Sequence, residues 1–138
     1  FCPKMASLYP RWIRIPESQT EIASVGAMYQ KRGFPGCICS VDCVHRCLAM
    51  LCSLYCGKEK FPTISFKVVV SHDGRILSVT PGHAGTRNDK TIVRHDEFVM
   101  AIQKGKYWHV QFELHDGSGG MLTERGCYLM CDWGYHKW

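Results

Sequence analysis

Two short apolar segments each run directly into an aspartate, and this repeated arrangement constrains the fold more than any other feature of the chain. The first is Cys37-Ile38-Cys39-Ser40-Val41-Asp42 and the second is Cys127-Tyr128-Leu129-Met130-Cys131-Asp132, so the two acids are 132 − 42 = 90 positions apart. An aspartate is disfavoured inside a buried strand, and each acid is therefore predicted at a strand end. If the two strands are neighbours in one sheet, both carboxylates reach the same edge.

A pair of carboxylates at one sheet edge has a restricted chemistry. Like charges held close together raise a pKa or require a divalent cation between them. Mg²⁺ takes oxygen ligands, commonly one or two carboxylates together with substrate phosphates, and such ions support phosphodiester cleavage. The alternative remains open that Asp42 and Asp132 are ordinary cap or turn residues, because aspartate is common in those positions.

The N-terminal region, residues 1–32, is predicted to be a helical lead-in to the main domain. A helix is expected over 17–30, with Ser18 as N-cap and Glu21 at the spacing of a capping box. Four apolar residues then share one face at helical spacing and are predicted to pack against the core: Ile22, Val25, Met28 and Tyr29.

The remaining pattern indicates a mixed α/β domain. Two β-branched runs, 64–70 and 76–79, flank Asp73-Gly74 and predict a hairpin with a type I′ turn. Asn88 is expected to cap one helix from Asp89 to about Gln103. A strand is predicted over 108–112, and the glycine-rich stretch 117–120 is predicted to be a turn.

Composition excludes some classes of protein. The 138 residues are enough for one domain, and no apolar run is long enough to span a bilayer, so no membrane association is expected. Nine cysteines, an odd number placed in apolar runs, favour a reduced intracellular protein over a disulfide scaffold. The net charge of +5 permits a polyanion partner. The chain starts Phe1-Cys2-Pro3, without initiator Met or signal pattern, and we expect it to be the interior of a longer chain.

Four segments, in order, resemble Harbinger-type DDE transposases. Residues 33–45, Gly-Phe-Pro-Gly-Cys-Ile-Cys-Ser-Val-Asp-Cys-Val-His, resemble the region of the first catalytic aspartate of that family. The stretch 57–63 and the hairpin after it resemble the next strands, and 82–89 resembles the family's glycine-containing loop and helix start. Residues 126–135 resemble the strand of the second catalytic aspartate. The resemblance covers about 33–138.

The resemblance implies an RNase H-like mixed sheet with flanking helices and a metal-dependent DNA nuclease and strand-transfer activity. In that family an Asp, Asp, Glu triad holds two Mg²⁺ ions, for which Mn²⁺ can substitute. Asp42 would be the first catalytic and metal-binding acid and Asp132 the second, with Asp89 and His45 in supporting positions. DNA is the implied partner, with a separate DNA-binding protein as a further one, and the nucleus is the implied location.

Two departures from the family pattern shape our expectations. The third acid should lie on a helix beyond Trp138, so we expect 33–138 to be a partial catalytic domain, incomplete at its C-terminal side and weakly active or inactive alone. Trp133 also stands where the family has a small residue, which would crowd the metal edge.

Two other functions fit parts of the sequence. A structural zinc site would use Cys43, Cys47, Cys52 and Cys56 with His45, although the usual Cys-x₂-Cys pairs are absent. A domesticated, non-catalytic DNA- or protein-binding module would keep the fold and its partners without the chemistry, but no base-reading motif is visible.

Overall fold

The computed structural model describes the chain except for residues 1–8, 10, 48–54, 133–134 and 136–138. Trp133 and Cys52, which entered the sequence predictions, therefore lie outside the described residues. The described elements are α2 (Gln19–Gln30), β1 (Cys37–Cys47), β2 (Thr63–Val70), β3 (Ile76–Val79), β4 (His83–Ala84), α3 (Asp89–Val93), α4 (Glu97–Gln103), β5 (Gln111–His115), β6 (Met121–Arg125) and β7 (Tyr128–Met130). Among the described residues, no helix has the length and apolar character needed to cross a bilayer.

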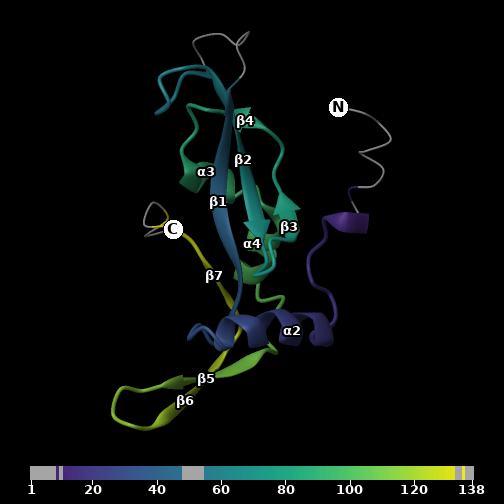
Figure 1. Ribbon diagram of the computed structural model, residues 1–138, viewed down its shortest axis with the longest axis vertical. Coiled ribbons are helices and arrows are strands. Elements are labelled where there is room, and N and C mark those ends of the chain that lie inside the picture. Colours follow the sequence, from purple (N-terminus) through teal and green to yellow (C-terminus); the bar gives the residue numbers. More distant parts are fainter. Residues whose placement is uncertain (1–8, 10, 48–54, 133–134, 136–138) are drawn as a thin grey trace.

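The strands form one mixed five-stranded sheet and a separate two-stranded ribbon, which confirms the mixed α/β prediction. In the larger sheet the order is β3-β2-β1-β7, with β4 paired to β2. Strand β2 is antiparallel to both β1 and β3, whereas β7 is parallel to β1. The ribbon of β5 and β6 projects from the body below α2 (Figure 1).

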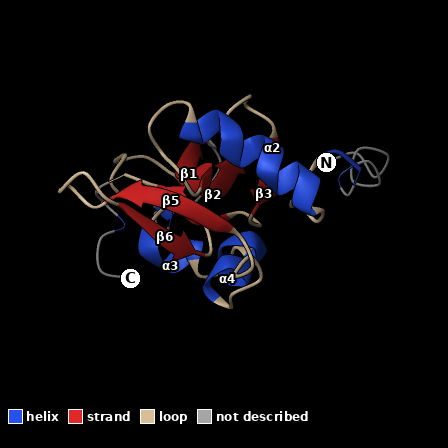
Figure 2. Ribbon diagram, turned by 90° about the horizontal axis from the view of Figure 1, so that it is seen from below, coloured by secondary structure: helices blue, strands red, loops and turns tan. Residues whose placement is uncertain are grey.

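The core lies between the sheet and the helices. Helix α2 packs on β1, α3 on β2 and α4 on β3, and Figure 2 shows α3 and α4 together on one side with α2 on the other. The buried cluster draws on all of these elements: Ile22, Ile38, Cys39, Val41, Val69, Leu77, Val93, Phe98, Val99, Tyr107 and Tyr135.

Helix α2 forms as predicted. The Ser18 side chain accepts the N–H of Glu21, and the Glu21 side chain accepts the N–H of Ser18, so both halves of the capping box are present. Ile22 and Tyr29 are buried on the predicted face. The helix is held at its start by the bidentate contact of Arg14 with Glu21.

The β2–β3 hairpin also forms, but its turn differs from the prediction. The N–H of Ser71 donates to the carbonyl of Arg75 at 2.9 Å, and that of Gly74 donates to Ser71 at 3.0 Å. Only Gly74 in this loop has a positive φ, of 79°. A type I′ turn needs two such residues, so the connection is instead a three-residue loop with glycine in the left-handed position.

Two further expectations were wrong in their boundaries. The single helix expected from Asp89 to Gln103 is two helices, because Asp96 caps α4 by accepting the N–H of Val99 at 2.9 Å. Asn88 caps α3 as predicted. The strand expected over 108–112 begins instead at Gln111 and pairs with β6. The stretch 117–120 lies in the turn between them, as predicted.

Candidate active site at the junction of β1 and β7

Strands β1 and β7 lie side by side and run parallel. Their register pairs Cys39 with Leu129 and Ser40 with Met130, an offset of 130 − 40 = 90 residues. Asp132 stands at the same offset from Asp42, two residues beyond the last residue of β7. The two acids thus each follow the paired residues Ser40 and Met130 by two positions, Asp42 within β1 and Asp132 just after β7.

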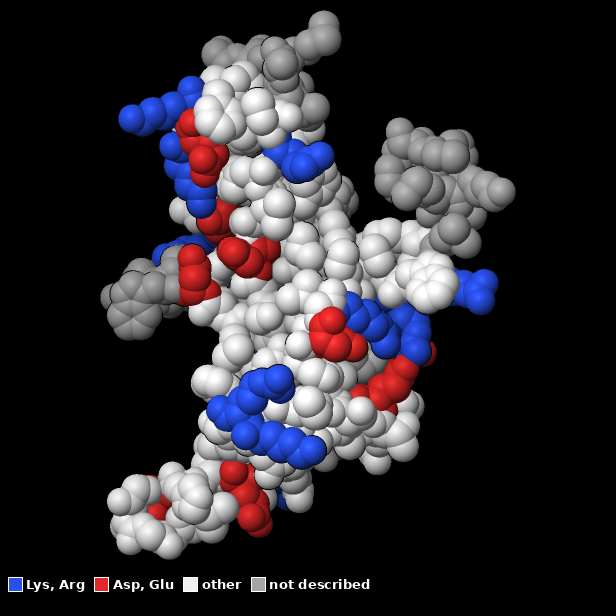
Figure 3. Space-filling model, viewed as in Figure 1, with Lys and Arg blue, Asp and Glu red and all other residues white. Residues whose placement is uncertain are grey.

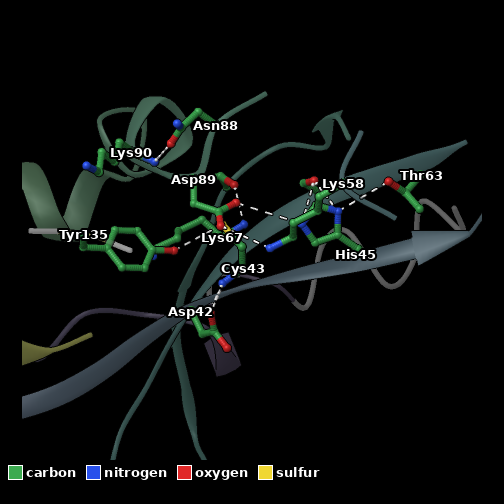
Figure 4. A network of polar contacts seen from close by, with 12 residues as sticks. Asp42, Cys43, His45, Lys58, Thr63, Lys67, Asn88, Asp89, Lys90 and Tyr135 are labelled. Carbon is green, nitrogen blue, oxygen red and sulfur yellow. Dashed lines mark hydrogen bonds and ion pairs between the residues drawn. The ribbon is translucent and has the colours of Figure 1, made fainter. Parts of the chain in front are cut away.

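Asp42 is not at a strand end, contrary to the prediction, because β1 continues to Cys47. Its side chain is exposed, so its charge is hydrated and does not have to terminate the strand. One carboxylate oxygen, Oδ1, accepts the backbone N–H of Cys43 at 2.7 Å. In Figure 4 the side chain of Asp42 points away from Asp89 and Tyr135, to the other side of β1.

Asp132 follows β7 and contacts Tyr135 through the backbone. Its carbonyl accepts the N–H of Tyr135 at 3.2 Å, and its side chain is exposed. Tyr135 itself is buried; its hydroxyl lies 3.4 Å from Sγ of Cys43, to which it donates. The aromatic ring covers Lys67 on β2, whose Nζ lies 3.7 Å from the ring centroid.

The other two predicted residues, Asp89 and His45, meet in a polar cluster beneath α3 (Figure 4). Nε2 of His45 lies 4.0 Å from Oδ1 of Asp89, and Nζ of Lys58 lies 3.5 Å from Oδ2 of the same carboxylate. On its other side, Nδ1 of His45 lies 3.0 Å from the hydroxyl of Ser65 and 3.4 Å from that of Thr63. His45 is thus oriented by two hydroxyls and faces one carboxylate.

The structure consequently places three of the four predicted residues on opposite faces of β1. Successive strand residues alternate between faces, so Asp42 is on one and His45 on the other. Asp89, the first residue of α3, lies with His45. The sequence resemblance placed all four near one site and did not distinguish the faces.

Lys67 is the residue of this region that sequence reasoning missed. Its side chain is fully buried, and its ammonium nitrogen has no hydrogen-bond partner among the described residues. Burial lowers its pKa, an effect opposed by electrostatic interactions with Cys43, Asp42 and Asp89. An unpaired buried ammonium is costly, and such groups are concentrated at functional sites. Its only sequence signal is a lysine inside a run rich in β-branched residues.

The surroundings of Lys67 are poorly solvated, and the pKa values of the neighbouring Cys43 and Tyr135 side chains reflect this. Burial raises the pKa of the Cys43 thiol to about 11 and also raises that of the Tyr135 hydroxyl. Both groups are therefore protonated at neutral pH. Because the thiolate is the form that attacks and that binds metals, Cys43 is an inert thiol here.

The zinc alternative loses support from this geometry. Cys43 and Cys47 lie four residues apart on one strand, which separates their Cα atoms by about 13 Å. One tetrahedral zinc ion cannot bind both with its short bonds to sulfur. Within the described part of the chain, no group of three or more His, Cys, Asp or Glu residues is placed to hold a metal ion.

Comparison with known proteins supplies one match. A family model described as plant transposon protein matches residues 10–138. Comparison with curated proteins and with solved structures gave no match.

Proposed function

The chain belongs to the plant transposon protein family, and from this premise we propose that it derives from a divalent-metal-dependent DNA endonuclease of the Harbinger DDE type. The observation that carries the proposal is the parallel pairing of β1 with β7 at an offset of 90 residues, the same offset that relates Asp42 to Asp132. Two acids distant in sequence thereby each follow a residue of the last β1–β7 pair, Ser40 and Met130, by two positions.

The proposed fold is RNase H-like. Three consecutive antiparallel strands, β1, β2 and β3, followed by helices and then a strand parallel to β1, support this assignment. In this proposal the β5–β6 ribbon is an insertion between α4 and β7, since it belongs to a separate sheet.

The donor chemistry at the junction fits Mg²⁺ or Mn²⁺. Asp42 and Asp132 are exposed carboxylates, and oxygen ligands are those that these hard cations prefer. Oδ1 of Asp42 is oriented by the N–H of Cys43, which leaves Oδ2 for a cation. A bound ion would supply Lewis-acid activation of a phosphodiester and of the attacking water. The chain's own contribution is to hold one carboxylate on β1 and the other just after the end of the neighbouring strand β7.

Asp89 and His45 act as supporting residues in this proposal. They lie on the opposite face of β1 from Asp42 and contact each other, Lys58 and two hydroxyls. Their proposed role is to fix α3 and the outer half of β1, so that Asp42 keeps its position. They are not proposed as metal ligands.

Mn²⁺ binding to the full chain tests the site directly. We expect Asp42→Asn and Asp132→Asn each to weaken binding by about tenfold or more, since even the partners of metal ligands contribute 10- to 100-fold. Glu113→Gln, which removes an exposed acid from the distant ribbon, is the matched control and should leave the affinity unchanged. Equal affinities for all four proteins would refute the metal site.

Nicking of supercoiled DNA with Mg²⁺ or Mn²⁺ tests the chemistry. Any cleavage by the chain should be lost in both asparagine variants and kept in the Glu113→Gln control. Salt-dependent DNA binding without metal-dependent nicking would instead support the alternative function, a non-catalytic binding module that keeps the fold.

A further inference from the structure

The β5–β6 ribbon leaves a complete strand edge open to solvent. All five residues of β6 are exposed, including Met121 and Leu122, each about half exposed. The ribbon projects away from the sheet and helices (Figures 1 and 3). The other strand, β5, is less open, because its first residues line a groove of about 300 Å³ against α2. The β6 edge is thus open along its whole length, whereas the β5 edge borders this groove at its base.

The β5–β6 ribbon is held in place at both its tip and its base. At its tip, Oδ1 of Asp116 accepts the N–H groups of Ser118 and Gly120 at 2.8 and 2.9 Å. At its base, the Phe112 ring packs so closely on Gly36 that a Cβ there would lie 2.5 Å from it. A preorganised edge loses little conformational entropy when a further strand is added.

The hydrogen-bond pattern shows which residues of β6 present their backbone outward. The N–H of Asp116 donates to Gly120 and that of Gly126 donates to Val110, so 116–120 and 110–126 are bonded pairs. Bonded and non-bonded pairs alternate along an antiparallel ladder, which makes 111–125, 113–123 and 115–121 non-bonded pairs. The N–H and C=O groups of Met121, Thr123 and Arg125 therefore face the free edge.

We propose that the β6 edge is a self-association surface, on which a second copy of this chain adds its own β6 in antiparallel register centred on Thr123. In this register Thr123 of one chain pairs with Thr123 of the second chain, and Met121 of each chain pairs with Arg125 of the other. All three outward-facing residues of each strand are then matched, and the two ribbons become one four-stranded sheet. An open edge of this kind is the usual template for strand addition.

Charge and apolar contacts agree with this register. Glu124 falls opposite Leu122 of the other copy and Arg125 opposite Met121, so no like charges face each other directly. Leu122 lies diagonally across from Leu122 of the second copy on one face of the new sheet, so both lose exposed apolar surface. A register shifted by one residue would oppose inward-facing and outward-facing backbone groups.

Sedimentation of the full chain across a concentration series tests the association. The native chain should form a concentration-dependent dimer. Thr123→Pro should abolish it, because proline removes an outward N–H that the β5–β6 ladder does not use. Thr123→Val keeps that N–H and the strand propensity, and it should dimerise like the native chain. A native chain that stays monomeric, or a proline variant that dimerises normally, overturns the proposal.

Cysteine cross-linking tests the register and does not depend on the proline variant. In the proposed dimer the Cα atoms of the two Thr123 residues lie about 5.5 Å apart, within disulfide range. The two Glu113 residues share that row and face but are three strand spacings apart, about 14 Å. Under oxidised glutathione, Thr123→Cys should form a covalent dimer well above the native cysteine background, and Glu113→Cys should not. Equal yields from the two variants overturn the register.

Discussion

The ammonium of Lys67 has no hydrogen-bond partner among the described residues although its side chain is fully buried, and Lys67→Met isolates what that charge costs. Methionine keeps the unbranched stem and removes only the charged end. Replacing buried charged groups by apolar ones of similar volume is neutral or stabilising by about 1–4 kcal/mol. The contact with the Tyr135 ring, 3.7 Å away, offsets about 2 kcal/mol of any gain. We therefore expect Lys67→Met to stabilise the protein by up to about 2 kcal/mol.

Thermal and urea unfolding at neutral pH measure this change, and a gain of about 2 kcal/mol raises Tm by up to about 8 °C in a domain of this length. Lys58→Met is the matched control. Its side chain is 63% exposed and pairs with Asp89 at 3.5 Å, so its loss should change stability by no more than about 0.5 kcal/mol. A Lys67→Met protein less stable than the native chain by more than about 1 kcal/mol would refute the reasoning, because the ammonium would then be net stabilising.

The same substitution has a pH signature of defined sign. The pKa of Lys67 is lowered in the folded state from the ordinary value of 10.5. Between the folded and unfolded pKa values the unfolded chain binds more protons, so native stability rises with pH across that window relative to the variant. The advantage of Lys67→Met should thus be greatest at lower pH and shrink as pH approaches 10.5. Taking the difference between the two proteins cancels the titration of their shared thiols and tyrosines.

Two further substitutions test local features of the fold. Ser18→Ala removes the capping-box acceptor of α2 and should cost about 1 kcal/mol in urea unfolding, whereas Thr20→Ala in the same turn should cost less; equal losses would argue against the cap. Gly36→Ala should be far more damaging than Gly33→Ala, since both have positive φ, of 82° and 86°, but only at Gly36 would the new Cβ meet the Phe112 ring. The difference should be about 1–3 kcal/mol, the usual cost of overpacking, and equal Tm values for the two variants would contradict it.

Features specified by adjacent residues could be predicted from the sequence. The capping box of Ser18 and Glu21 and the N-cap Asn88 are formed by groups within three residues of each other, so the local pattern determines them. The β2–β3 hairpin and β7 were likewise predicted. The break between α3 and α4 was not predicted. The position of Asp96 depends on a hydrogen bond from the hydroxyl of Ser78 on β3 as well as on its contact with its own helix.

The feature hardest to predict from the sequence was which face of β2 is buried. The alternation of its sequence sets Ile64, Phe66 and Val68 on one face and Ser65 and Lys67 on the other, and hydrophobicity alone would bury the first set. The structure buries Ser65 and Lys67 beneath α3 and leaves the apolar set only half-buried. The deciding interactions, with His45 on β1 and Tyr135 near the C-terminus, are long-range and have no local sequence signal.

The same alternation bears on the candidate site. Asp42 and His45 are three residues apart on β1, and an odd spacing places them on opposite faces of the sheet. A single site that used both side chains directly would require a break in the strand between them, whereas β1 is continuous through Cys47. Asp132 and Asp42 are separated by 90 positions, the same separation as between the paired residues Met130 and Ser40 of β7 and β1. Metal binding should therefore depend on the two aspartates, and substitutions of His45 should act through the stability of α3 and β1.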